Sequence, residues 1–76
     1  MNNMRRKALQ EIIEQLEELN EKIESLYNDE YESFDNIPEN FIGTERYDKA
    51  ESAVENLQSA MDSVNDSVEY INCAIV

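Results

Sequence analysis

The chain has few of the residues on which enzyme active sites and the cross-links of small domains depend. It contains no histidine, no tryptophan and one cysteine, Cys73, in 76 residues. The commonest general base and the commonest metal ligand are therefore missing, and an internal disulfide is excluded. We expect no enzyme activity, no metal ion and no cofactor. A single domain of this size has a marginal core, so oligomerisation is the expected additional support.

Basic residues are also scarce, with 6 Lys and Arg against 18 Asp and Glu and a net charge of −12. A surface this negative repels nucleic acid and anionic membranes, so we expect neither as a direct partner. Two interpretations of the charge stay open. It gives a soluble, solvated helical surface, or it makes the protein an acidic ligand for a basic groove.

Long apolar runs are absent, since none approaches the ~18 residues that a membrane helix needs. The basic start, Met1 to Gln10, lacks a following apolar core, so we expect no signal peptide. A lone cysteine without an export signal favours the cytoplasm.

The chain does contain two runs of apolar residues at heptad spacing, which is typical of helices packed along their whole length. The more regular run has steps of three and four: Tyr47, Ala50, Val54, Leu57, Met61, Val64, Val68, Ile71, Ile75. The same spacing gives an earlier run: Leu9, Ile12, Leu16, Leu19, Ile23, Leu26. Further residues are expected on the flanks of these runs: Ile13, Tyr27 and Phe34 on the first, and Ala53, Ala60, Ser67 and Ala74 on the second.

The break between the runs is Asp35 to Gly43. Pro38 disfavours helical geometry before it, Gly43 accepts positive φ, and Thr44 is a natural helix cap. The pattern predicts one domain over 1–76, with a helix over 3–34 capped by Asn2 or Asn3, a turn over 35–44 and a helix over 45–74. Phe41 and Ile42 are expected to fold over the open end, with an exposed contact site as the alternative.

Two helices of similar length around a short break predict an all-α fold, an antiparallel coiled-coil hairpin. Six pairs of residue numbers across the break add to the same total and predict six layers: Leu9–Ile71, Ile12–Val68, Leu16–Val64, Leu19–Met61, Ile23–Leu57 and Leu26–Val54. Basic clusters then face acids: Arg5, Arg6 and Lys7 lie beside Asp62, Asp66 and Glu69, and Arg46 and Lys49 lie beside Asp29, Glu30 and Glu32. A lone hairpin would leave the apolar flanking residues exposed to solvent, so we expect a homodimer that forms a four-helix bundle.

Acidic residues on the outside of the second helix are the candidate partner-binding site: Glu51, Glu55, Asp62, Asp66 and Glu69. No Lys or Arg occurs from Ala50 to Val76. Exposed helix faces usually interleave both signs, because opposite charges three or four residues apart stabilise a helix. The binding interpretation explains the one-sided pattern by a basic partner surface, and the alternative explains it by solubility alone.

The segment Tyr31 to Leu57 reads YESFDNIPENFIGTERYDKAESAVENL. It resembles short acidic helical-hairpin proteins encoded by bacteriophages and prophages of Gram-positive bacteria. The resemblance covers about a third of the chain and implies a shared turn: Pro38, Glu39, Asn40, Gly43, Arg46 and Tyr47. Phe41 is a further candidate residue of this turn. It further implies a protein that works in the host cytoplasm. By analogy it would bind and modulate or inhibit a basic host protein, as an anti-defence protein or a mimic of nucleic-acid charge. The alternative is a structural, assembly or adaptor module without inhibitory activity.

Overall fold

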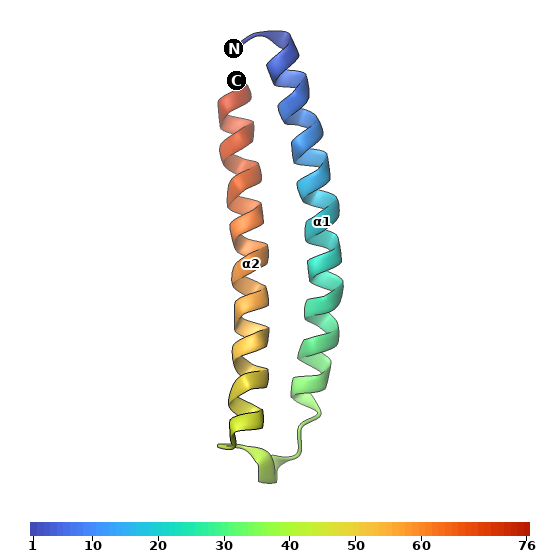
Figure 1. Cartoon of the computed structure of the whole chain (residues 1–76), viewed down its shortest axis with the longest axis vertical. Coiled ribbons are helices and arrows are strands. Elements are labelled where there is room, and N and C mark those ends of the chain that lie inside the picture. The colour runs from blue at the N-terminus through green and yellow to red at the C-terminus, as the bar shows by residue number, and fades with distance from the viewer.

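The computed structural model describes residues 1–76 and consists of two long helices joined by a short turn (Figure 1). Helix α1 spans Asn3–Asp35, the 3-10 helix η1 spans Glu39–Phe41, and α2 spans Glu45–Ile75. The helices are antiparallel and both termini lie at the end opposite the turn. The chain measures 59 × 16 × 13 Å. The predicted all-α hairpin is confirmed, and each helix ends one residue later than expected.

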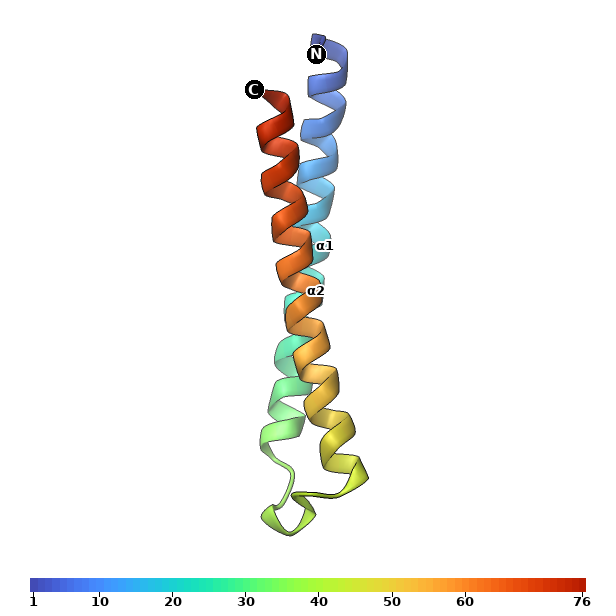
Figure 2. The same cartoon turned by 90° about the vertical axis from the view of Figure 1, so that its left-hand side faces the viewer.

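The two helices lie next to each other along their length in Figure 1, and in the view turned by 90° α1 crosses behind α2 at a shallow angle (Figure 2). This is the geometry of coiled-coil packing, in which side chains of one helix fit between those of the other. No strand and no third long helix covers the pair. Each helix therefore has one side against its neighbour and its other sides exposed.

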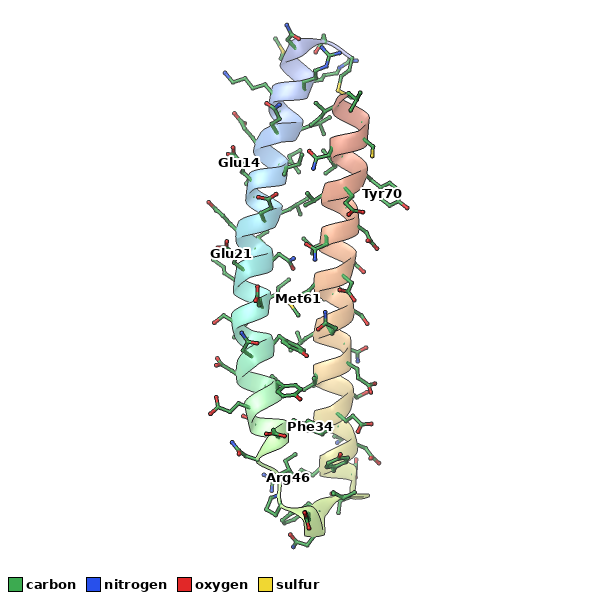
Figure 3. All side chains as sticks on the ribbon, turned by 180° about the vertical axis from the view of Figure 1, so that it is seen from behind. Glu14, Glu21, Phe34, Arg46, Met61 and Tyr70 are labelled. Carbon is green, nitrogen blue, oxygen red and sulfur yellow. The ribbon has the colours of Figure 1, made fainter.

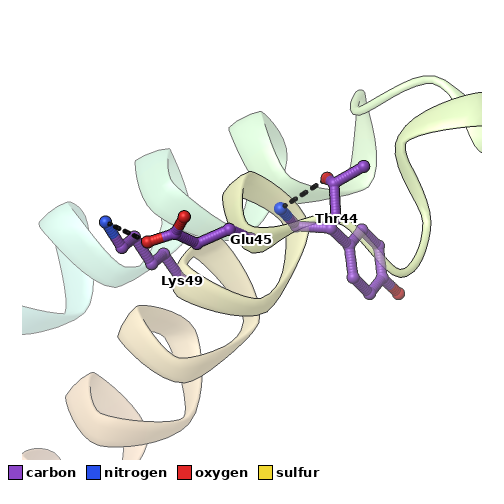
Figure 4. A network of polar contacts seen from close by, with 4 residues as sticks. Thr44, Glu45 and Lys49 are labelled. Atoms are coloured by element: carbon purple, nitrogen blue, oxygen red, sulfur yellow. Dashed lines mark hydrogen bonds and ion pairs between the residues drawn. The ribbon is translucent and has the colours of Figure 1, made fainter.

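Both helices begin at a side-chain cap. The Asn2 Oδ1 accepts a hydrogen bond from the Arg5 backbone N–H at 2.8 Å, so Asn2 and not Asn3 caps α1. The Thr44 Oγ1 accepts from the Tyr47 N–H at 3.3 Å (Figure 4) and donates to the Phe41 carbonyl at 2.6 Å. Thr44 thereby satisfies an otherwise unpaired N–H of α2 and ties this helix to the turn.

The side of α1 that faces α2 differs from the prediction at every second layer. Ile13 is 8% exposed, whereas Ile12, Leu19 and Leu26 are 42%, 52% and 60% exposed. Apart from Arg6, the half-buried or buried residues of α1 are Leu9, Ile13, Leu16, Asn20, Ile23, Tyr27 and Phe34. The predicted layers Ile12–Val68, Leu19–Met61 and Leu26–Val54 are therefore wrong, and so is the placement of Ile13, Tyr27 and Phe34 on the flank.

Two contacts between the helices fix the register. The rings of Phe34 and Tyr47 lie 5.1 Å apart between centroids. At the other end, the Arg6 Nε donates to the Ile75 carbonyl at 3.1 Å. These contacts put Ile13, Asn20 and Tyr27 at the levels where Ile12, Leu19 and Leu26 were predicted. Leu9, Leu16 and Ile23 keep their predicted levels opposite Ile71, Val64 and Leu57.

The aromatic residues give the physical reason for this choice of face. An aromatic side chain buries more apolar surface than an aliphatic one. The observed face covers Tyr27 and Phe34, whereas the predicted face would have left both rings on its flank. The cost is one polar residue, Asn20, between the helices.

The inward side of α2 is as predicted. All nine residues from Tyr47 to Ile75 in the second heptad run are half-buried or buried. Ala53 and Ala60 are half-buried on its flank. The core is thin, since only Ile13, Val54 and Met61 are buried in the whole chain.

The predicted ion pairs between the helices are not formed. The one ion pair joins Lys49 Nζ to Glu45 Oε1 at 3.0 Å within α2 (Figure 4). Arg6 instead reaches the carbonyl end of α2, where the helix dipole is negative, and Arg46 lies 5.4 Å from the centroid of the Phe41 ring. Exposed ion pairs contribute only about 0–1 kcal/mol, so contacts with a carbonyl and a ring compete with them.

Candidate protein-interaction surfaces

Five carboxylates form an acidic stripe along α2, defined as Glu51, Glu55, Asp62, Asp66 and Glu69. At ~100° per residue their positions fall within an arc of roughly 60° on the helix, and all five are exposed. None takes part in an ion pair. The only side-chain hydrogen bond to the stripe comes from the Gln58 Nε2 to the Asp62 Oδ1 at 3.2 Å. The stripe is therefore a row of uncompensated negative charges that points away from the core.

Further acidic residues lie on the outside of α1, where Figure 3 shows Glu14 and Glu21 pointing away from α2. The net charge of −12 is spread over a length of 59 Å, which gives about one net negative charge per 5 Å. Duplex DNA carries one charge per ~1.7 Å of its axis and a single strand one per ~3.4 Å. The hairpin is thus a long acidic rod of lower charge density than a duplex.

The flank of the hairpin on the other side from the acidic stripe carries apolar residues. We call it the apolar face and define it as Ile12, Leu19, Leu26, Ala53, Ala60 and Ala74. All six directly precede an inward residue, as Leu19 precedes Asn20 and Ala60 precedes Met61. In an antiparallel pair, positions that precede the inward residues on both helices lie on the same side. The larger side chains of this face are 42–60% exposed, so the hairpin has an unpartnered apolar side.

Asn20 is a polar residue that the sequence interpretation missed. Its Nδ2 donates to the Asn65 Oδ1 at 3.1 Å, and its own Oδ1 is buried and accepts no hydrogen bond. A polar residue at one inward position of a coiled coil specifies register and oligomeric state at a cost in stability. The signal in the sequence was the seven-residue spacing of Ile13, Asn20, Tyr27 and Phe34.

The turn residues are brought together, and most of them support the end of the hairpin. Gly43 has φ 88°, in the left-handed region that favours glycine. Phe41 is half-buried beneath the Arg46 guanidinium, and Tyr47 contacts Phe34. Pro38 precedes η1 with φ −59° and Asn40 is exposed. Ile42 is 60% exposed, so the expectation that it folds over the end with Phe41 is wrong.

The surface has no pocket, and no group of three or more His, Cys, Asp or Glu side chains is arranged to hold a metal ion. Cys73 is a free, exposed thiol. Neither helix has an apolar stretch long enough to cross a membrane. The two flanks of the hairpin, one acidic and one apolar, are the candidate functional surfaces. Comparisons of the chain with models of protein families, with curated proteins and with solved structures gave no match.

Proposed function

We propose that the protein works by binding a basic surface of another protein through its acidic stripe. The observation that carries the proposal is the absence of any cation paired with the five exposed carboxylates. Interleaved opposite charges would stabilise α2 by about 0.2–0.5 kcal/mol per pair, and the stripe forgoes this. A one-sided negative surface speeds encounter with a positive partner and rejects negatively charged ones.

The partner we propose is a host protein, in keeping with the resemblance of the turn segment to proteins of phages and prophages. Binding would occur in the host cytoplasm and would modulate or inhibit that protein, as anti-defence proteins do. The charge density of the rod is nearer to that of a single strand than of a duplex. Among nucleic-acid enzymes, one whose groove accepts a single strand is the better electrostatic match.

We propose in addition that the working unit is a homodimer in which two hairpins form a four-helix bundle. The apolar face supports this, because removing exposed side chains as large as Leu19 and Leu26 from water is favourable. The same face favours a second candidate function, an assembly or adaptor module without inhibitory activity. The two functions differ in the kind of protein that is expected to bind the acidic stripe.

Capture from a lysate of a Gram-positive host, at physiological salt, tests the acidic-ligand function. The test variant carries Glu51→Lys, Glu55→Lys and Asp62→Lys. The matched control carries Glu11→Lys, Glu14→Lys and Glu18→Lys, which change the same amount of charge at exposed positions of α1. Circular dichroism checks that both stay helical.

We expect the native protein and the α1 control to retain a basic protein that the stripe variant loses. A basic nucleic-acid enzyme supports the inhibitor function, and a phage structural protein supports the assembly function. Equal retention by both variants, or no retained partner, means that the charge serves solubility and the proposal is wrong.

A further inference from the structure

The hairpin exposes more surface than a compact protein of its mass. A monomer of 8.9 kDa typically exposes about 4,800 Å², whereas this chain exposes 5929 Å². The excess is about 1,100 Å², and a stable protein–protein interface covers about 800 Å² on each partner. The excess exposed area is therefore large enough to form one side of a stable interface with a second chain.

The apolar face is also where a second copy meets the least repulsion. The chain has 18 acidic residues, yet none occurs in the two seven-residue series that contain this face, which run from 5 to 33 on α1 and from 46 to 74 on α2. Charged residues of both signs border this face by helical spacing. Lys22 and Lys49 lie four residues before Leu26 and Ala53, and Asp29 and Glu30 lie at the end of α1 near the turn. Two copies of a chain of charge −12 repel each other overall, so the series of positions without acids is the favoured side for self-association.

The sizes of the side chains select one arrangement. Large residues occur on α1 at a seven-residue spacing, and small ones occur on α2 at the same spacing when Ser67 is counted between Ala60 and Ala74. The register of the hairpin places Leu19 level with Ala60 and Leu26 level with Ala53. If two hairpins face each other with their turns at the same end, every large residue of α1 meets a small residue at its own level on α2 of the other copy. If the turns lie at opposite ends, α1 meets α1, and large residues oppose large ones.

We propose that the apolar face binds a second copy of the chain, with the two-fold axis parallel to the long axis of the hairpin and α1 of each copy against α2 of the other. All neighbouring helices are then antiparallel. The same arrangement brings Asp29 of one copy near Lys49 of the other at the border. It also brings Tyr70, which points away from the hairpin in Figure 3, over the start of α1 of the other copy.

This inference rests on the dimeric state proposed above, and sedimentation equilibrium tests that state first. The native chain should sediment at twice 8.9 kDa at micromolar concentration, and added salt should tighten the dimer by screening its charge. Leu19→Lys should abolish the dimer, whereas Met4→Lys should keep it, because Met4 is 82% exposed and lies at the start of α1, about four turns from Leu19. A folded native monomer, or a dimer that tolerates Leu19→Lys, overturns the proposal.

Disulfide cross-linking tests the arrangement without disrupting the face. In a Cys73→Ser background, chains with Leu19→Cys are mixed with chains with Ala60→Cys, dimers are exchanged, and the mixture is oxidised. We expect cross-links between the two kinds of chain, because Leu19 and Ala60 face each other across adjacent helices. Leu19→Cys alone should not cross-link, since its two copies lie on diagonal helices beyond the ~7 Å reach of a disulfide. Leu19 lies at the middle of α1, so self-cross-linking of Leu19→Cys would show the arrangement with opposite turns and would refute the one proposed.

Discussion

The contact between Phe34 and Tyr47 offers a direct thermodynamic test of the register. Their ring centroids lie 5.1 Å apart with planes tilted by 45°, a geometry in which aromatic pairs contribute about 0.5–1.5 kcal/mol beyond the area they bury. A double-mutant cycle with Phe34→Leu and Tyr47→Leu isolates this coupling. Leucine keeps each position apolar and helical, so the cycle removes the ring–ring contact with little other change.

Urea unfolding of the four proteins, followed by circular dichroism at one protein concentration, supplies the free energies. We expect a coupling of about 1 kcal/mol. Tyr70→Leu combined with Tyr47→Leu is the matched control, because Tyr70 is exposed near the opposite end of α2. That control should be additive within about 0.3–0.5 kcal/mol. Coupling no larger in the Phe34–Tyr47 cycle than in the control would show that these rings are not in contact and that the register is wrong.

Three further predictions concern single positions. Asn20→Leu should raise the free energy of unfolding by about 1–2 kcal/mol, because it removes the buried acceptor that lacks a hydrogen bond. Chemical denaturation measures this change, and a destabilised variant would mean that the Asn20 Oδ1 has a hydrogen-bond partner. Gly43→Ala should lower stability by about 1 kcal/mol through its φ of 88° alone, since nothing lies within 4 Å of an added Cβ; an unchanged midpoint would contradict it. Thr44→Ala should cost about 1 kcal/mol and Thr44→Asp much less, because the aspartate side chain also caps a helix; equal losses in thermal unfolding would show that the cap contributes nothing.

The sequence was a good guide wherever a single feature determined the structure. The turn follows from Pro38, Gly43 and Thr44, whose backbone preferences act locally, and the inward side of α2 follows from a heptad run with no competing run. On α1 two heptad runs share Leu9, Leu16 and Ile23 and differ in the residues between them. Periodicity fits both runs equally well, so it could not choose between Ile12 and Ile13.

The choice on α1 depends on contacts between residues far apart in the chain. The Phe34–Tyr47 contact and the hydrogen bond from Arg6 to Ile75 join opposite ends of the chain, and neither follows from local spacing. The interhelical ion pairs were predicted wrongly because adjacency in register does not make a weak exposed pair form. The acidic stripe was predictable because exposure of Glu51 or Asp62 requires only that the inward side of α2 be known.

The native thiol of Cys73 allows the assembly to be measured without any substitution. A nitroxide attached to Cys73 reports distances between copies by double electron–electron resonance, since the chain has one cysteine and it is exposed. With turns at the same end, the two labels lie at the same level on diagonal helices, and helix spacings of 8–10 Å give a label distance below about 35 Å. With turns at opposite ends, the labels would lie about 40 Å apart or more, because Cys73 is ~13 residues from the middle of α2 at ~1.5 Å per residue. A single distance below about 35 Å is the predicted result, and a longer distance, or no dipolar coupling at micromolar concentration, would contradict the claim that the apolar face joins two hairpins.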